Sequence, residues 1–292
     1  MTTTGPVMGA DTGISWADDT FNPWWGCTRV SPGCEKCYAE QLATVRRKLP
    51  IWGVDAERKA MSDQHWKLPA KWNREAEHMG IRRRVFCASM ADVFETPPER
   101  NTQAWGVMND ARNRLWAAIY ATPMLDWLLL TKRPENVATI APFGTRWPPN
   151  VWLGTTVEDR PRLSRIEHLR AIPAQRRFVS YEPALEGVDY RGHLEGVDWL
   201  IIGGESGSNA RPFDVAWARD AIAAAREAKV APFMKQLGTA PRFATNDRMF
   251  WDKGSHAKKW DVLAEWPADI RVQEWPRSPA ADASSWAGFG AA

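Results

Sequence analysis

Short runs of apolar and β-branched residues recur along the chain, and a helix-like stretch follows most of them. Seven runs fit this pattern: residues 14–16, 84–88, 127–130, 151–155, 177–180, 198–202 and 231–235. Such runs, bounded by polar or glycine-rich residues, are typical of buried β-strands. Helix-favouring stretches lie between them, at residues 35–49, 99–121, 159–171 and 214–229. This alternation predicts a parallel sheet covered by helices.

The spacing of the strands favours an α/β fold built on a parallel (β/α) barrel, partial or complete and TIM-like. An open doubly wound sheet is the alternative that the same alternation allows. We expect the barrel to occupy residues 1–241 and a Trp-rich extension, residues 242–277, to pack on it. The Ala/Ser/Gly-rich residues 278–292 are expected to form a disordered tail.

Composition sets wide limits on function. The 292-residue chain is 44% apolar but has no apolar run long enough to span a membrane, which predicts a soluble protein. No apolar segment typical of a signal peptide lies at the N-terminus, so we expect a cytoplasmic location. The net charge of +3 permits a nucleic-acid partner without requiring one. Most of the 18 tryptophans are expected in the core, and a minority could stack on a base or cofactor.

The residues that follow the predicted strands carry many reactive side chains. These segments are residues 89–92, 131–134, 155–158, 181–183, 203–207 and 235–236. Because the carboxyl ends of parallel strands meet on one face, we expect the segments to form a single site. Two adjacent glycines, Gly203 and Gly204, would let the backbone approach a ligand closely.

Three of the four cysteines, Cys27, Cys34 and Cys37, lie within eleven residues. At this spacing three thiolates can hold a metal ion or an iron–sulfur cluster and leave one coordination position open. A disulfide is disfavoured in a cytosolic protein. A structural zinc ion stays open as an alternative, although it would need a fourth ligand and no Cys or His lies at a recognisable second-pair spacing. We expect the fourth cysteine, Cys87, to be a small buried residue rather than a hydrogen-atom donor.

Several motifs together resemble the radical-SAM-like phage protein family, the gp thirty-seven/gp sixty-eight family of bacteriophages and bacteria. They are Asn22-Pro23, Gly26-Cys27, Ser31–Cys34, Cys37–Glu40, Leu129–Pro134, Val151–Gly154, Glu182-Pro183 and Gly203–Gly207. The resemblance runs from about residue 16 to residue 276. It implies a radical-SAM type of barrel, with a [4Fe-4S] cluster held by the three clustered cysteines and S-adenosylmethionine on the fourth iron.

The resemblance also implies roles for individual residues. Reductive cleavage of S-adenosylmethionine would yield a 5′-deoxyadenosyl radical that takes a hydrogen atom from the substrate. Tyr38 would contact the adenine, and the rest of the cofactor would be held by Ser89, Asp92, Gly203, Gly204 and Glu205. The substrate would face Lys132, Arg133, Glu158, Glu182 and Lys235, with catalytic roles expected for all of these except Arg133. An electron donor such as flavodoxin or ferredoxin would be a partner.

This chain departs from the usual radical-SAM pattern in two places. The gap of six residues between Cys27 and Cys34 is longer than usual. Residues 89–92, Ser-Met-Ala-Asp, occupy the position after the second strand where a glycine-rich motif normally holds the methionine group. The cofactor contacts are therefore less well specified by the sequence than the cluster ligands are.

Cationic residues at the predicted strand ends, Lys132, Arg133 and Lys235, suggest a nucleotide or nucleic-acid substrate and hence DNA modification or repair. Two basic runs, residues 46–48 and 82–84, could add phosphate contacts, with Arg83 as a candidate. The tryptophans between the runs, expected to stack on bases, are Trp52, Trp66 and Trp72. The alternative is a DNA- or RNA-binding protein whose iron–sulfur cluster or zinc ion is structural.

Overall fold

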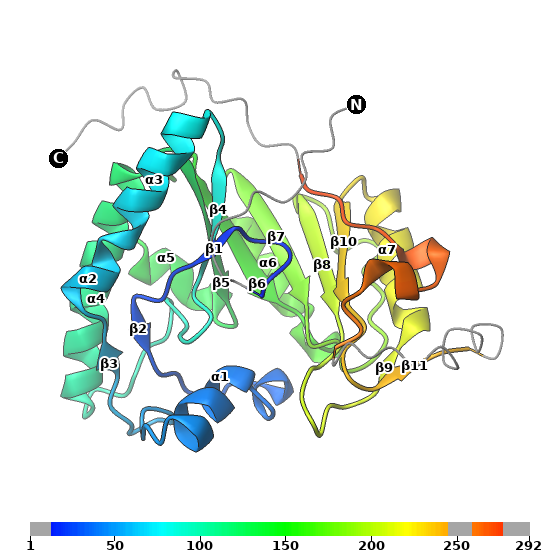
Figure 1. The fold of residues 1–292 in the computed structure, drawn as a ribbon, viewed down its shortest axis with the longest axis horizontal. Helices are drawn as coiled ribbons and strands as arrows, with labels where there is room; N and C mark the ends of the chain where they lie inside the picture. Colours follow the sequence, from blue (N-terminus) through cyan, green and yellow to red (C-terminus); the bar gives the residue numbers. More distant parts are fainter. Residues whose placement is uncertain (1–12, 245–258, 277–292) are drawn as a thin grey trace.

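A seven-stranded parallel sheet forms the centre of the computed structural model, which describes residues 13–244 and 259–276. The strand order is β1-β4-β5-β6-β7-β8-β10. The strands are β1 (Asp19–Thr20), β4 (Arg83–Cys87), β5 (Leu125–Thr131), β6 (Val151–Thr156), β7 (Arg176–Tyr181), β8 (Trp199–Gly203) and β10 (Ala231–Gln236). The sheet curls into a half barrel with helices around its outside (Figure 1). The α/β class predicted from the sequence is confirmed.

Helices connect the strands and cover the convex face of the sheet. They are α2 (Asp63–Trp66), α3 (Leu68–Met79), α4 (Thr102–Ala121), α5 (Val137–Ile140), α6 (Ser164–Ala171) and α7 (Val215–Glu227). Near the N-terminus, α1 (Tyr38–Glu40) continues directly into a π-helical segment, Gln41–Arg46. Short 3-10 turns occupy Pro32–Cys34, Pro134–Asn136, Arg160–Arg162, Leu263–Glu265 and Ala268–Ile270. Outside the main sheet, β2 (Trp24–Trp25) pairs with β3 (Lys59–Ala60), and β9 (Phe213–Asp214) pairs with β11 (Pro241–Arg242).

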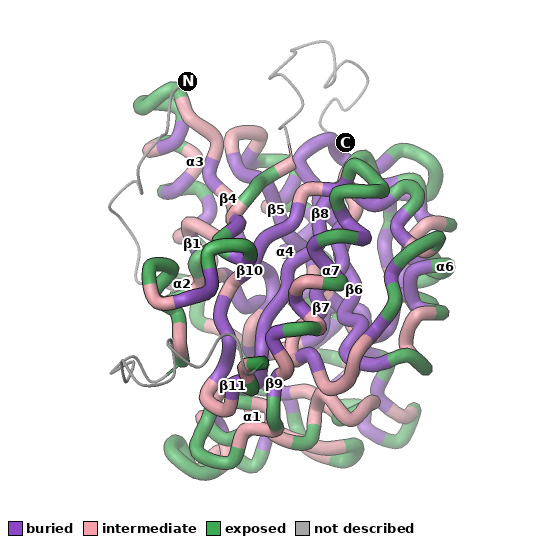
Figure 2. Tube along the Cα trace, turned by 90° about the vertical axis from the view of Figure 1, so that its right-hand side faces the viewer, coloured by how far each residue is buried: buried purple, intermediate pink, exposed green. Residues whose placement is uncertain are grey.

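Side chains alternate between the two faces of the sheet, and both faces are buried (Figure 2). In β8, Leu200 and Ile202 pack toward the helices, whereas Trp199 and Ile201 point to the inner face. The inner face carries one hydrophobic cluster: Trp16, Phe86, Leu128, Trp152, Phe178, Trp199, Ile201 and Phe233. Burial on both faces explains why the strands read as continuous apolar runs in the sequence.

The first predicted strand, residues 14–16, is wrong. Trp16 does not pair with the sheet but fills its inner face, with its ring centroid 4.7 Å from that of Phe86. The first strand lies instead at Asp19–Thr20, where the Asp19 carboxylate forms a 2.8 Å ion pair with Arg83. A polar dipeptide stabilised by a distant cation carries no apolar signal, so the pattern favoured the neighbouring tryptophan.

Residues 272–275 run along the edge strand β10. The backbone N–H of Met234 donates to the carbonyl of Val272 at 2.8 Å, and Trp275 packs on Phe233 with a 4.8 Å centroid distance. Arg84, at the start of β4, lies 5.0 Å from the Trp275 ring. This segment therefore closes the inner hydrophobic cluster away from the strand carboxyl ends. Residues 245–258 and 277 of the expected extension, and the whole of the expected tail at 278–292, lie outside the described residues.

No helix within residues 13–244 and 259–276 is both long and apolar enough to cross a membrane.

Candidate functional site

A cavity of about 700 Å³ opens at the carboxyl ends of the strands. Trp16, Phe86 and Leu130, which belong to or pack on the inner hydrophobic cluster, line its interior. Its wall contains most of the residues singled out from the sequence: Cys27, Cys34, Cys37, Tyr38, Ser89, Asp92, Lys132, Arg133, Glu182, Gly204, Glu205 and Lys235. The cysteine loop and the ends of five strands, separated by long stretches of sequence, thus meet around one space. Glu158, Gly203 and Arg83 are not among its lining residues.

Three half-buried cysteines reach this cavity from a single loop. Cys27 follows β2, Cys34 ends a 3-10 turn, and Cys37 caps α1. Within the described part of the chain, no three Cys, His, Asp or Glu side chains are grouped so as to hold a metal ion. A four-iron cluster makes a different demand, because each of its cysteines binds a separate iron. The three free thiols line one cavity, so they are the residues that would hold such a cluster.

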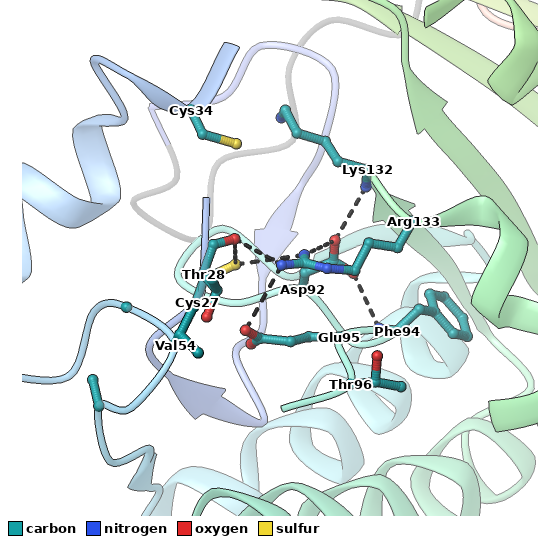
Figure 3. Close-up of polar contacts among 12 residues, drawn as sticks. Cys27, Thr28, Cys34, Val54, Asp92, Phe94, Glu95, Thr96, Lys132 and Arg133 are labelled. Carbon is teal, nitrogen blue, oxygen red and sulfur yellow. Dashed lines mark hydrogen bonds and ion pairs between the residues drawn. The ribbon is translucent and has the colours of Figure 1, made fainter. Parts of the chain in front are cut away.

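Arg133 lies beside the first of these thiols (Figure 3). Its Nη1 donates to Cys27 Sγ at 3.8 Å and to Asp92 Oδ2 at 2.9 Å, and its Nη2 donates to the Thr28 carbonyl at 2.7 Å. Burial, reinforced by the charge of Glu95, raises the pKa of the Cys27 thiol, and Arg133 acts against that rise. The buried guanidinium is thus directed at the cysteine loop, while the residue also lines the cavity in which the sequence predicted a substrate contact.

Asp92 uses both carboxylate oxygens to shape the loop after β5. Oδ1 accepts from Thr131 Oγ1 at 2.7 Å and from the Phe94 N–H at 3.0 Å, and Oδ2 accepts from the Lys132 N–H at 3.1 Å. Burial opposes ionisation, but Arg133 and these hydrogen bonds together bring the pKa of Asp92 below its ordinary value. The carboxylate predicted to hold the cofactor is therefore committed to positioning Lys132 and Arg133.

Lys132 extends into the cavity, where its Nζ donates to Thr156 Oγ1 at 3.3 Å. Glu158 is fully buried, and its Oε2 accepts a hydrogen bond from Arg165 Nη1 at 2.8 Å. A Cβ added to Gly33 would lie 3.1 Å from Glu158 Oε1, so this carboxylate supports the cysteine loop from beneath. The structure does not bring Glu158 to the cavity wall, where the sequence predicted a substrate contact.

A carboxylate and an ammonium group from two different strand ends meet on the wall. Lys235 Nζ donates to Glu182 Oε1 at 2.5 Å, and Gln236 Nε2 donates to the same oxygen at 3.1 Å. Gln236 also donates to the Gly204 carbonyl at 3.2 Å, which joins β10 to the loop after β8. The predicted residues Glu182 and Lys235 are thus together and form a hydrogen-bonded pair.

Glu205 is held by Arg211, a residue that the sequence did not single out. Arg211 donates from its backbone N–H and its Nε to Glu205 Oε2 at 2.8 and 3.0 Å. Its Nη2 reaches the Pro32 carbonyl at 3.0 Å, and its Nη1 lies 3.1 Å from Glu35. Arg211 thereby joins the loop after β8 to the cysteine loop. Its distant partners leave no signal in the sequence by which it could have been found.

Glycine is required at position 204 by the chain's own packing. A Cβ there would lie 2.3 Å from the Leu237 carbonyl oxygen and 2.9 Å from the Phe213 Cβ. At Gly203 a Cβ would meet only the Glu182 side chain, at 3.2 Å. Backbone contact with Leu237 therefore explains glycine at position 204. Gly204 also lines the cavity, and the ligand contact predicted from the sequence stays a prediction.

Sequence comparison places these residues in one family. The family, described as "Protein of unknown function (DUF5131)", matches residues 11–266. The chain belongs to the DUF5131 family. Neither a curated protein nor a solved structure matches it. The matched range contains the cysteine loop and every strand of the sheet, so the cavity of this DUF5131 protein lies wholly inside the family's region.

Two residues of the cavity wall in the DUF5131 protein, Tyr38 and Ser89, contact each other. Tyr38 donates from its hydroxyl to the Ser89 carbonyl at 3.2 Å. Asn22 Nδ2 donates to Ser89 Oγ at 3.1 Å, and Asn22 Oδ1 accepts from the Met90 N–H at 2.7 Å. The segment after β4 is therefore held beside the start of α1. Asn22 orients this segment and belongs to the Asn22-Pro23 motif noted in the sequence.

The predicted role of Arg83 in binding nucleic acid does not fit its position. Arg83 begins β4, at the end of the sheet away from the cavity, and its guanidinium is buried in ion pairs with Asp19 and Glu75, each at 2.8 Å. The three tryptophans predicted to stack on bases differ in position. Trp72 is buried and Trp66 packs on the same core, whereas Trp52 lines the cavity.

Cys87 lies at the end of β4 on the helix-facing side of the sheet. It is fully buried, and burial raises the pKa of its thiol. It does not line the cavity. This position agrees with the small buried residue expected from the sequence, and it provides a cysteine outside the candidate site for use as a control.

Proposed function

We propose that this DUF5131 protein is an iron–sulfur enzyme of the radical-SAM type that cleaves S-adenosylmethionine to act on a nucleotide or nucleic acid. One observation carries the proposal: Cys27, Cys34 and Cys37 reach a single cavity at the carboxyl ends of a parallel sheet. Catalytic sites of parallel α/β folds lie at this end of the strands. We assign the half barrel to the radical-SAM type because the cysteines follow β1 and precede β4.

The three cysteines would hold a [4Fe-4S] cluster, and the neighbouring Tyr38 and Ser89 would hold the adenosine of S-adenosylmethionine. When bound and reduced by a donor such as flavodoxin or ferredoxin, the cluster would supply the electron that cleaves this cofactor to a radical able to take a substrate hydrogen atom. The protein's contribution is to bind and orient the reactants and to exclude water. The inner hydrophobic cluster excludes water from the inner face of the sheet, below the cavity.

Lys132 and the Glu182–Lys235 pair are the groups best placed to orient a bound molecule. Lys132 Nζ is directed into the cavity and bonds only the neutral Thr156 hydroxyl among the residues the structure describes, so it remains free to bind an anionic group. Lys235 Nζ donates to Glu182 Oε1, and together they offer one donor and one acceptor face to a polar substrate. These side chains would recognise and orient the substrate. Substitutions of them should therefore alter turnover more than iron content.

Iron and sulfide content after anaerobic reconstitution tests the proposal. The wild-type protein should hold about four iron and four sulfide ions per chain, and its cluster should absorb light at about 400 nm. Cys27→Ala, Cys34→Ala and Cys37→Ala should each lose most of the iron, whereas Cys87→Ala, the control outside the cavity, should keep it. Stoichiometric zinc without iron would overturn the proposal and favour a nucleic-acid-binding protein with a structural metal. Full iron in the triple cysteine variant would also overturn it.

A further inference from the structure

The carboxylates that line the cavity are all neutralised by the protein itself. Their ion pairs are Asp92 with Arg133 at 2.9 Å, Glu182 with Lys235 at 2.5 Å and Glu205 with Arg211 at 2.5 Å. A sixth lining residue with a charge partner, Arg29, pairs with Glu40 outside the cavity at 2.7 Å. The carboxylate charge of the wall is therefore already balanced by the protein's own cations.

Four more cations line the same cavity: Lys36, Arg46, Lys132 and Lys259. Among residues 13–244 and 259–276, none of them has a carboxylate within 4.0 Å. Unbalanced positive charge in a concave site attracts anions strongly, because the low-dielectric walls concentrate the field. The cavity is therefore built for a ligand with several negative charges, more than the one carboxylate of S-adenosylmethionine.

The positive charge continues from the cavity onto the surface beside α1. Arg46 and Arg47, both exposed, end the π-helical segment that follows α1, and Lys59 lies on the neighbouring strand β3. Arg47 and Lys59 lie 5.9 and 5.4 Å from the Trp25 ring. We call Arg46, Arg47 and Lys59 the basic rim. It combines cations with aromatic surface, the combination by which proteins bind single-stranded nucleic acids.

We infer that the basic rim binds the phosphate backbone of a single-stranded nucleic acid and directs one of its bases into the cavity. A space of about 700 Å³ admits a nucleotide beside a cofactor but not a duplex. Tyr38, which is 53% exposed, and Trp52 line the route with aromatic rings on which bases can stack. The inference rests on the proposed function, since it names the substrate class of the same cavity.

Fluorescence anisotropy with a labelled 12-nucleotide strand tests the inference, with single-stranded DNA, single-stranded RNA and the matching DNA duplex measured across a salt series. The triple variant R46Q/R47Q/K59Q should bind the single strand at least about tenfold more weakly, and its salt slope should be flatter by about two units. The control variant K67Q/K71Q/R74Q removes the same number of positive charges, but from the region of α3. It should bind the single strand as tightly as the wild type does. All three proteins should keep the same iron content.

The inference fails if the rim variant binds the strand as the wild type does, if the α3 control weakens binding equally, or if the duplex binds as tightly as the single strand. It also fails if the rim variant loses only reduction by flavodoxin, which would make the rim a docking surface for an acidic protein. Iron content separates the two proposals. Strand binding at the rim without iron would refute the cluster alone, and iron without strand binding would refute this inference alone.

Discussion

Arg133 Nη1 donates a hydrogen bond to Cys27 Sγ at 3.8 Å while the same nitrogen lies 2.9 Å from Asp92 Oδ2. A buried cation is thus fixed against one of the three proposed cluster ligands. Reduction adds negative charge to a cluster, and hydrogen bonds to its sulfurs raise the reduction potential. Arg133 therefore anchors the cysteine loop, and in the proposed function it would also tune the cluster.

We predict that removing this cation lowers the midpoint potential of the cluster. Arg133→Gln alone would leave the Asp92 charge buried without its partner, which typically costs about 3–5 kcal/mol, so the informative variant is R133Q/D92N. Its potential should be lower than that of the wild type, and Arg133→Lys, which keeps the charge, should lie between them. An anaerobic redox titration followed by electron paramagnetic resonance gives the three values. Equal potentials would show that Arg133 has no electronic influence on the cluster.

The second prediction concerns Gly26, directly before Cys27. Its φ of +115° is a conformation that favours glycine, and an added Cβ would lie 2.4 Å from the Ile51 carbonyl oxygen. Gly53 has a similar φ of +122° but no atom near the position of an added Cβ. It therefore serves as a control that shows the cost of backbone strain without a steric clash. Gly53→Ala should cost about 1 kcal/mol of unfolding free energy. Gly26→Ala should lower the unfolding free energy by more than twice as much and should also reduce the iron content. Urea denaturation measures both variants. Equal losses of unfolding free energy would show that the added Cβ of Gly26→Ala does not clash with Ile51.

A third prediction separates the two glycines after β8. Gly204→Ala should destabilise the fold by about 2–4 kcal/mol, because its Cβ would overlap the Leu237 backbone, which cannot move aside easily. Gly203→Ala should cost less than about 1 kcal/mol, since the Glu182 side chain can shift. Thermal and urea unfolding of both variants decide the matter. If both were as stable as the wild type, the close approach to Leu237 would not be the reason for glycine.

The fourth prediction is a pH dependence due to His65. Burial lowers the pKa of His65 from its ordinary value of 6.5, while its Nε2 lies 2.9 Å from the Asn22 carbonyl and its ring stacks on Phe21. A base with a lowered pKa in the folded state binds fewer protons when folded than when unfolded. Its contribution to stability is therefore present above about pH 6.5 and is lost as the pH falls below that value.

His65→Gln should make the unfolding free energy less dependent on pH between 7.5 and 5.5. His78→Gln, at an exposed position near the end of α3, is the matched control and should retain the wild-type dependence. Urea unfolding at several pH values measures both. An unchanged pH profile in His65→Gln would place the titrating group elsewhere.

Six of the seven predicted strands could be located from the sequence because both faces of the sheet are buried. The run in β5, Leu125–Thr131, is apolar over most of its length and needs no knowledge of its partners. The gathering of strand ends around one cavity follows from parallel topology alone. Helix α3 was missed because its face toward the core is provided by a few residues, such as Trp72 and Ala76, among many charged ones.

Roles set by ion pairs could not be predicted in this way. In the sequence, Arg83 and Arg133 cannot be told apart from arginines exposed to solvent. Only the fold brings Asp19 to Arg83 and Asp92 to Arg133. The sequence therefore identified which segments meet but not which charges remain free there. Lys132 is free to bind a ligand, whereas the adjacent Arg133 is not, and this difference depends on the direction of each side chain.

The central claim is that the cavity binds and cleaves S-adenosylmethionine on a cluster held by Cys27, Cys34 and Cys37. The most direct measurement is mass spectrometry of 5′-deoxyadenosine formed when the reconstituted, dithionite-reduced protein is incubated anaerobically with S-adenosylmethionine. The wild-type protein and Cys87→Ala should release 5′-deoxyadenosine and methionine in equal amounts, and Cys34→Ala should release neither. A wild-type protein that carries a full cluster yet forms no 5′-deoxyadenosine, with or without a single-stranded oligonucleotide, would contradict the account.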